Sequence, residues 1–168
     1  MKKVVWLWLV IGIIVGSAAL GVTEFALHAT STNEFCSSCH KNDAAPEWRA
    51  SKHYVNAYGV RAGCSDCHIP KDFVPKMIRK TKALGEVYGH FTGVIDTPEK
   101  FEAKRLEMAE SEWKRLKANG AQECRNCHFM DAVNNPDKEY LADMHKGVLE
   151  SGEQVCTDCH KGVAHKAP

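Results

Sequence analysis

The chain carries almost no net charge, because its 22 Lys and Arg residues are balanced by 21 Asp and Glu residues to leave +1 over 168 residues. This balance gives no indication of nucleic-acid binding, which favours a basic excess. After the N-terminus, clusters of Leu, Ile and Val are scarce, no second long apolar run follows the first, and no βαβ pattern is visible. The chain therefore has little aliphatic material from which to build a core.

No cysteine lies outside four copies of the motif Cys-x-x-Cys-His, which begin at residues 36, 64, 124 and 156. This motif is the attachment signature of c-type haem. The two thiols bond to the porphyrin edge, and the adjacent histidine becomes an axial ligand of the iron. The predicted attachment residues are Cys36, Cys39, Cys64, Cys67, Cys124, Cys127, Cys156 and Cys159, and the predicted proximal ligands are His40, His68, His128 and His160.

Other interpretations of these cysteines explain less. A zinc ribbon does not need a histidine directly after the second cysteine, yet one follows in all four copies. A disulfide framework suits an exported chain but does not explain the fixed two-residue gap. A redox motif of the thioredoxin type expects a βαβ pattern. Four haems would also supply the missing hydrophobic mass, so we expect a mainly α fold with little or no sheet that does not form without haem.

The N-terminus contains an uncharged apolar run from Val4 to Leu20, which is close to the length that spans a bilayer as a helix. Lys2 and Lys3 precede it, so the positive-inside rule places the N-terminus in the cytoplasm. A cleaved signal peptide is the alternative, but its apolar core would be shorter and would end at a small-residue site. We predict a cytoplasmic stub and single transmembrane anchor over residues 1–27. The remaining residues, 28–168, would form a haem domain on the outer side.

Two histidines occupy matching places within the repeat: His53 lies eleven residues before Cys64, and His145 lies eleven residues before Cys156. This self-similarity predicts two dihaem modules, at about 34–70 and 121–168, joined by a segment at about 71–120. We expect His53 and His145 to be distal ligands of partner haems, since imidazole is the usual second ligand of an electron-transfer haem. A surface histidine is the simpler alternative for each.

His165 follows the last motif closely, so it is a candidate ligand for a neighbouring haem and not for its own. Four six-coordinate haems need eight protein ligands, and the motif histidines with the three distal candidates supply seven. One position is left without an evident histidine. His28 and His90 are the spare candidates, although the repeat supports neither.

Two helices are predicted between the modules. The first spans about 72–88, with Asp72 as a possible N-cap and Gly89 as a possible end, and its basic face beside an apolar face suits lipid headgroups. An ordinary solvated helix face would explain those charges equally well. The second begins at Thr97-Pro98, ends at Asn119-Gly120, and carries an apolar stripe for core packing. A loop is predicted at 134–137.

Taken together, the anchor, the four motifs and several local stretches resemble the NapC/NirT family of membrane-anchored tetrahaem cytochromes c. The stretches are GVRAGC at 59–64, CHIP at 67–70, EVYG at 86–89, IDTPEKF at 95–101, ECRNCH at 123–128 and CHKGVAHK at 159–166. The resemblance covers essentially the whole chain. It implies a bacterial inner-membrane protein with one anchor and a periplasmic haem domain.

The resemblance also implies a function. Family members oxidise menaquinol or ubiquinol at the membrane surface and pass electrons through four covalently attached haems c. The electrons reach a periplasmic terminal reductase, or its cytochrome subunit, in nitrate, nitrite or N-oxide respiration. The implied partners are the quinol pool, that reductase and the lipid bilayer, and a homo-oligomer is possible. His53, His145 and His165 match the distal ligands of the family, and Lys80 and Glu86 match its quinol site.

The chain departs from the family pattern near the first two motifs. Many members have a methionine ligand two residues after the first Cys-x-x-Cys-His, where this chain has Asn42. Some have a histidine where this chain has Lys71, so the sixth ligand of the second haem stays open. Met130 is interpreted as haem packing. Two further functions stay open: a tethered electron relay without its own quinol site, and a multihaem reductase with an open haem.

Overall fold

The computed structural model describes residues 2–129 and 139–168. Every regular element in these ranges is a helix, so the predicted mainly α class is confirmed. Met130 and the loop predicted at 134–137 lie outside the described residues. The helices are α1 (Lys2–Ala29), α2 (Asn33–Cys39), α3 (Ala44–Ala50), α4 (Cys64–His68), α5 (Phe73–Phe91), α6 (Pro98–Ala118), α7 (Gln122–Arg125), α8 (Glu139–Ser151) and α9 (Cys156–Cys159).

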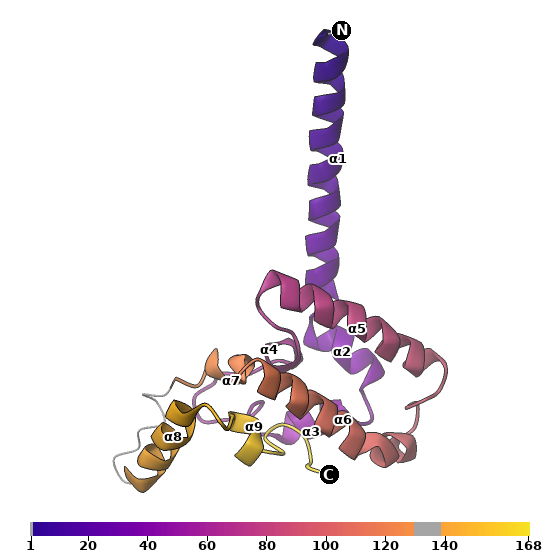
Figure 1. The fold of residues 1–168 in the computed structure, drawn as a ribbon. Helices are drawn as coiled ribbons and strands as arrows, with labels where there is room; N and C mark the ends of the chain where they lie inside the picture. Colours follow the sequence, from indigo (N-terminus) through magenta and orange to yellow (C-terminus); the bar gives the residue numbers. More distant parts are fainter. Residues whose placement is uncertain (1, 130–138) are drawn as a thin grey trace.

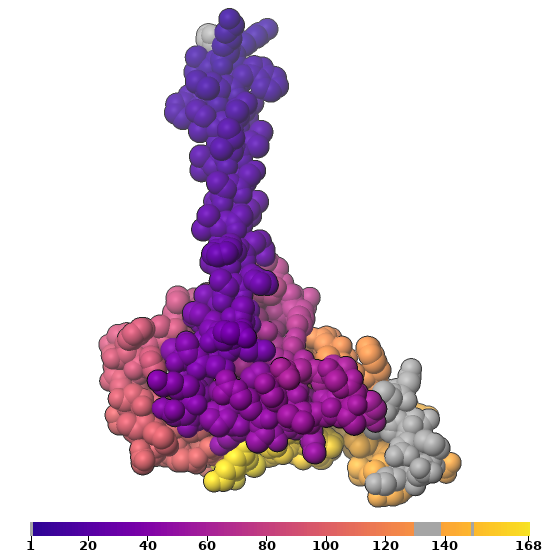
Figure 2. Space-filling model, turned by 180° about the vertical axis from the view of Figure 1, so that it is seen from behind, coloured from indigo at the N-terminus to yellow at the C-terminus, as the bar shows by residue number. Residues whose placement is uncertain are grey.

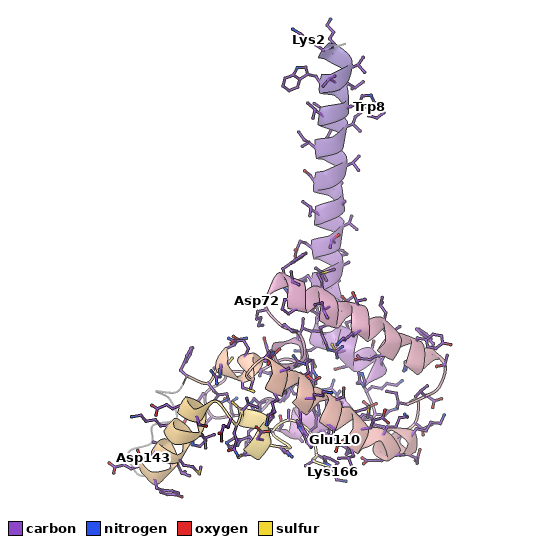
Figure 3. The ribbon with its side chains drawn as sticks, viewed as in Figure 1. Lys2, Trp8, Asp72, Glu110, Asp143 and Lys166 are labelled. Atoms are coloured by element: carbon purple, nitrogen blue, oxygen red, sulfur yellow. The ribbon has the colours of Figure 1, made fainter. Side chains whose placement is uncertain are left out.

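Helix α1 projects as a column from the rest of the molecule (Figure 1 and Figure 2). Its 28 residues include none that is buried, and they extend for about 42 Å, which exceeds a hydrocarbon layer of about 30 Å. Trp8 lies near the end remote from the other helices (Figure 3). Within the described ranges, α1 alone is long and apolar enough to cross a membrane. The structure thus supports the predicted anchor.

The predicted boundaries of α6 are confirmed. Thr97 is extended and its hydroxyl accepts a hydrogen bond from the backbone N–H of Lys100, while Pro98 fills the first helical position. At the other end Asn119 is the C-cap, and Gly120 follows with φ +66°, a conformation that glycine adopts without steric cost. Local sequence chemistry is therefore sufficient to define this helix.

Asp72 is the N-cap residue of α5, as predicted, whereas the predicted end at Gly89 is wrong. Asp72 precedes the helix, but its side chain makes no capping hydrogen bond, and only its backbone carbonyl accepts from Lys76. Gly89 does not end the helix, because α5 continues to Phe91. The left-handed turn that glycine permits falls later, at Gly93 with φ +75°.

Helix α5 lies across the foot of α1 (Figure 1) and carries a set of exposed apolar side chains. The large side chains of this set are 54% to 83% exposed, and they are Phe73, Val74, Ile78, Leu84, Tyr88 and Phe91. Lys76, Arg79 and Lys80, by contrast, are only partly exposed. Lys76, Arg79 and Lys80 thus lie partly against the protein, while the apolar side chains of α5 are exposed.

The hydrophobic core is small. In the described ranges the buried apolar residues are Ala45, Trp48, Phe101 and Ala121. Trp48 donates its indole N–H to the carbonyl of Ala62 at 2.9 Å and meets Tyr54 edge-on, with ring centroids 4.6 Å apart. These contacts join α3 to the loop before α4. They do not amount to a continuous aliphatic core, in agreement with the scarcity of clustered Leu, Ile and Val.

Candidate functional site

Each cysteine motif lies on or beside a short helix, so its two thiols stand one turn apart on the same face. Two of these helices share a capping device. Asp66 accepts a hydrogen bond from the N–H of Gly63 at 2.8 Å, and Asp158 accepts one from the N–H of Val155 at 2.9 Å. In both motifs the aspartate precedes the second cysteine. The aspartate of Cys-x-Asp-Cys therefore caps the N-terminus of the short helix that carries the motif.

The motifs adjoin one another in chain order. Asn33 of α2 accepts a hydrogen bond from the N–H of Cys64 at 2.8 Å, which ties the first motif to the second. The thiols of Cys36 and Cys64 share a hydrogen bond that lowers the pKa of Cys36 and raises that of Cys64. Burial, together with the nearby Cys156 thiol, raises the pKa of Cys124 to about 11. The second and third motifs meet where α4 packs against α7.

All eight cysteines are free thiols, so the structure contains no disulfide framework. Over residues 2–129 and 139–168, no group of three or more His, Cys, Asp or Glu side chains could hold a metal ion. A zinc ribbon needs four ligands around one ion.

The structure brings each predicted distal histidine to a different motif histidine. His53 faces His128 with ring centroids 6.1 Å apart, and His165 faces His68 at 6.1 Å. His145 stacks on His160 at 5.8 Å, with their Nε2 atoms 3.5 Å apart. Two of these three pairs join the first predicted module to the second. The histidine opposite His68, which sequence spacing left open, is His165.

These pairs fit axial ligation of haem iron. Metal–imidazole bonds of about 2 Å on opposite sides of one ion place two ring centroids roughly 6 Å apart. The other ring nitrogen of a ligating histidine normally donates to an acceptor, which leaves Nε2 for the metal. Nδ1 of His53 lies 3.2 Å from the carbonyl of Val163, and Nδ1 of His145 lies 2.7 Å from the carbonyl of Leu141. The axial assignments stay predictions, with this geometry in their support.

His40 of the first motif is arranged differently. Its Nδ1 lies 3.2 Å from Asp43, and in the described ranges no histidine ring stacks on it as in the three pairs. A cavity of about 150 Å³ opens beside Cys39 and is also lined by Asn42 and His90. His90, a spare ligand candidate, therefore lies near the first motif. His28 lies in the last turn of α1.

His68 contacts a carboxylate from another helix. Its Nδ1 lies 3.0 Å from Oε1 of Glu112 on α6. Burial alone would raise the pKa of Glu112, but hydrogen bonds with His68 and Arg115 outweigh it and lower that pKa to about 2. Sequence reasoning missed Glu112, because it lies 44 residues from His68 and no motif connects them.

The C-terminal segment that carries His165 is held by a buried arginine. Arg105 of α6 donates to Glu47 at 2.6 Å and to the carbonyl of Lys166 at 2.9 Å. Glu47 also accepts from the N–H of Lys166 at 2.9 Å and lies 3.9 Å from Nδ1 of His165. Arg105 thus fixes the segment that places His165 opposite His68.

Replacing Arg105 with alanine should destabilise this region strongly. The Arg105 side chain is only 8% exposed, and removing one partner of a buried ion pair typically costs about 3–5 kcal/mol. Thermal unfolding of the haem-loaded protein would measure the loss. Lys104→Ala on the same helix is the control, since Lys104 pairs with Glu107 at the surface. Equal stabilities of the two variants would contradict the structural role of Arg105.

Lys80 lies where the anchor meets the first motif. Its ammonium donates to the carbonyl and the hydroxyl of Thr30 at 2.7 and 2.9 Å, just beyond the end of α1. A cation is favourable there because it faces the negative end of the helix dipole. Burial lowers the pKa of Lys80, although the nearby Cys36 thiol opposes this effect. Lys80 therefore connects α5 with both the anchor and the first attachment site.

Glu86 is not brought into contact with Lys80. The two residues are six positions apart on α5, which separates them by about 120° around the helix. Glu86 instead pairs with Arg79 through two contacts of 2.9 and 3.3 Å, and its side chain is 60% exposed. Arg79 and Glu86 lie seven residues apart, which places them on the same face of α5 two turns apart, and the sequence alone did not reveal their contact.

Comparison with known proteins decides the family. The family described as "NapC/NirT cytochrome c family, N-terminal region" matches this chain over residues 1–168. The chain belongs to the NapC/NirT cytochrome c family. It is 51% identical to the cytochrome c-type protein NapC of Escherichia coli K12 over 165 residues, covering 95% of this chain and 81% of the relative. No solved structure matches the chain significantly.

Other relatives agree with this membership. The denitrification system component NirT of Stutzerimonas stutzeri is 43% identical over 162 residues, covering 95% of this chain and 81% of NirT. The cytochrome c-type protein TorC of E. coli K12 is 45% identical over 160 residues, covering 94% of this chain and 41% of TorC. As a member of a cytochrome c family, the chain binds haem c covalently, and its Cys-x-x-Cys-His motifs are the groups that can do so.

Proposed function

We propose that the protein is a membrane-bound quinol dehydrogenase. It would oxidise menaquinol or ubiquinol at the outer face of the bacterial inner membrane and deliver electrons to a periplasmic terminal reductase. The observation that carries this proposal is the position of Lys80, which contacts the end of the anchor at Thr30 and lies beside Cys36 of the first motif. A quinol from the bilayer would meet the first attachment site at this boundary.

The exposed apolar side chains of α5 support the same location. A helix with exposed Ile78, Leu84 and Phe91 beside a transmembrane anchor can lie in the interface, with its apolar side toward the acyl chains. This location keeps the prediction that a basic face beside an apolar face meets lipid headgroups, with Lys76 and Lys80 partly exposed and Lys82 exposed. An apolar quinol could reach Lys80 along this helix without crossing water.

The residues at this boundary have suitable chemistry. Oxidation of a quinol to the quinone releases two electrons and two protons. Lys80 can hold a quinol oxygen through a charge-assisted hydrogen bond, and Glu86 can accept a proton after exchanging its contact with Arg79. Covalently held haem supplies one-electron transfer. The four motifs, in contact in chain order, would hold four haems in a row that leads away from the membrane.

The orientation follows from charge and chemistry. Lys2 lies at the far end of α1 (Figure 3) and Lys3 follows it in the sequence, so the positive-inside rule places that end in the cytoplasm. The cysteine motifs then lie in the periplasm. NirT is described as a denitrification system component, so we infer a nitrogen-oxide or related reductase as the electron acceptor.

Reduction by quinol in a membrane tests the proposal. The full-length protein in liposomes should be reduced by menaquinol or ubiquinol, as followed by the haem absorption bands. The variant Lys80→Ala/Glu86→Gln should lose this reduction and keep full reduction by dithionite. Lys82→Ala/Glu99→Gln is the control, because both residues are exposed and neither contacts the anchor or the first motif.

Three outcomes would contradict the proposal. A wild-type protein that quinol does not reduce, but that a reduced partner protein does, would be a tethered relay. Turnover of nitrite or hydroxylamine without a partner would indicate a multihaem reductase with an open haem. Normal quinol kinetics in the Lys80/Glu86 variant would remove those residues from the quinol site.

A further inference from the structure

The hydrogen-bond partner of His68 is a carboxylate fixed within a network of charged side chains. Glu112 lies 3.0 Å from Nδ1 of His68 and also accepts from Nη2 and Nε of Arg115 at 2.7 and 3.0 Å. Glu112 comes from α6, whereas His68 ends α4. The carboxylate is therefore positioned by a helix that does not carry the motif.

Arg115 holds this carboxylate in place from several sides. It donates to the carbonyl of Cys67 at 2.8 Å and to Glu123 at 2.6 Å. The Glu123 side chain is only 1% exposed and also accepts from the side-chain amide of Asn119 at 2.8 Å. The network thus connects the second motif, through Cys67, with the residue directly before the third motif. Glu112 cannot turn away from His68 without breaking these contacts.

The other paired histidines have different surroundings. His53 and His145 place Nδ1 near the neutral backbone carbonyls of Val163 and Leu141. His40 does face a carboxylate, Asp43, but this carboxylate lies only three residues along the chain, and in the described ranges no histidine ring lies opposite His40 as in the three pairs. At the second motif the ring opposite His68 also lies near a carboxylate, with Glu47 at 3.9 Å from Nδ1 of His165. The second site therefore places a carboxylate near each of its two imidazoles, each carboxylate paired with an arginine, whereas Nδ1 of His53 and of His145 lies near a neutral carbonyl.

We propose that Glu112 is a positioning residue that lowers the reduction potential of the haem attached at Cys64 and Cys67. A carboxylate that accepts the Nδ1–H of an axial histidine fixes the ring orientation and makes the ligand more basic. A more basic, more electron-rich ligand favours ferric over ferrous iron, and hydrogen bonding around the ligands is a recognised determinant of haem potential. The second haem would therefore be harder to reduce than it would be with a neutral acceptor.

The test is an equilibrium redox titration of the full-length, haem-loaded variant Glu112→Gln, followed by optical and electron paramagnetic resonance spectra. Glutamine keeps the size and an acceptor oxygen but removes the charge. We expect one of the four midpoint potentials to shift upward, with four haems still attached and low-spin spectra retained. Glu110→Gln on the exposed face of α6 is the control and should leave all four potentials unchanged.

A second variant distinguishes tuning from a merely structural role. Glu112→Asp keeps the charge but withdraws it from His68, so it should raise the same potential by less than Glu112→Gln does. Unchanged potentials in both variants, or an equal shift in Glu110→Gln, would overturn the proposal. If Glu112→Gln does not retain four haems, the upward shift in Glu112→Asp decides the question. The titration uses chemical mediators, so its result is independent of whether the protein oxidises quinol.

Discussion

A chain produced without covalent haem attachment should fail to fold beyond its anchor. The physical reason is the small number of apolar contacts that the polypeptide makes with itself. In the described ranges no large side chain is fully buried. Among the four buried apolar residues, only Trp48 and Phe101 have large side chains. The accessible surface is 12422 Å², whereas a compact monomer of 18.7 kDa exposes about 8300 Å². Part of this excess belongs to α1, which has no buried residue.

Small domains are stable only by a narrow margin, because conformational entropy nearly cancels the gain from burial. Covalently held porphyrins would add large apolar surfaces between helices such as α2 and α4, which touch mainly through the motif residues. The ion pairs of Arg105 and Arg115 cannot replace this contribution. The cost of removing their charges from water offsets much of the attraction between them, so they add little net free energy of folding.

The measurement is straightforward in a cell lacking the haem-attachment machinery. We expect the haem-free protein to keep the helical signal of α1 in detergent and to show no cooperative thermal transition for the rest. The haem-loaded protein, purified in the same detergent, is the reference and should melt cooperatively. A haem-free chain with a cooperative transition of similar enthalpy would show that the polypeptide core is sufficient.

The features that sequence predicted correctly are those determined by neighbouring residues. The ends of α6 follow from Thr97-Pro98 and Asn119-Gly120, where capping and glycine geometry act within one turn. The apolar anchor likewise needs only a local count of uncharged residues. The prediction that Gly89 ends α5 was wrong because a glycine can also occupy a helix interior, at some cost in stability. The glycine with a left-handed backbone is Gly93, four positions later.

The arrangement of the candidate site could be predicted only in part. The repeat identified His53 and His145, and the position of His165 shortly after the last motif made it a candidate that the family resemblance then supported. However, their partners depend on how distant segments pack, as in the pairing of His53 with His128. The contacts of Glu112 with His68, and of Arg105 with Glu47, join residues more than 40 positions apart. Such contacts arise from tertiary packing, which periodicity does not record.

Removing the second motif should divide the path of electrons. The variant Cys64→Ala/Cys67→Ala should carry three haems, and quinol should then reduce only the first of them. The second motif lies between the others: α4 contacts α2 on one side and α7 on the other. Its loss opens a gap between the first attachment site, next to Lys80, and the third.

Variants that lack the third or the fourth motif make this prediction specific. The variant Cys124→Ala/Cys127→Ala should allow quinol to reduce the first two haems, and Cys156→Ala/Cys159→Ala should allow it to reduce three. Dithionite should reduce every attached haem in each variant, and mass spectrometry of the intact chain would count the haems. The extent of rapid quinol reduction should therefore rise stepwise with the position of the missing motif. If all three variants were reduced to the same extent, electrons would enter elsewhere than at Cys36 and Cys39, because only entry at that end makes each later motif depend on the ones before it.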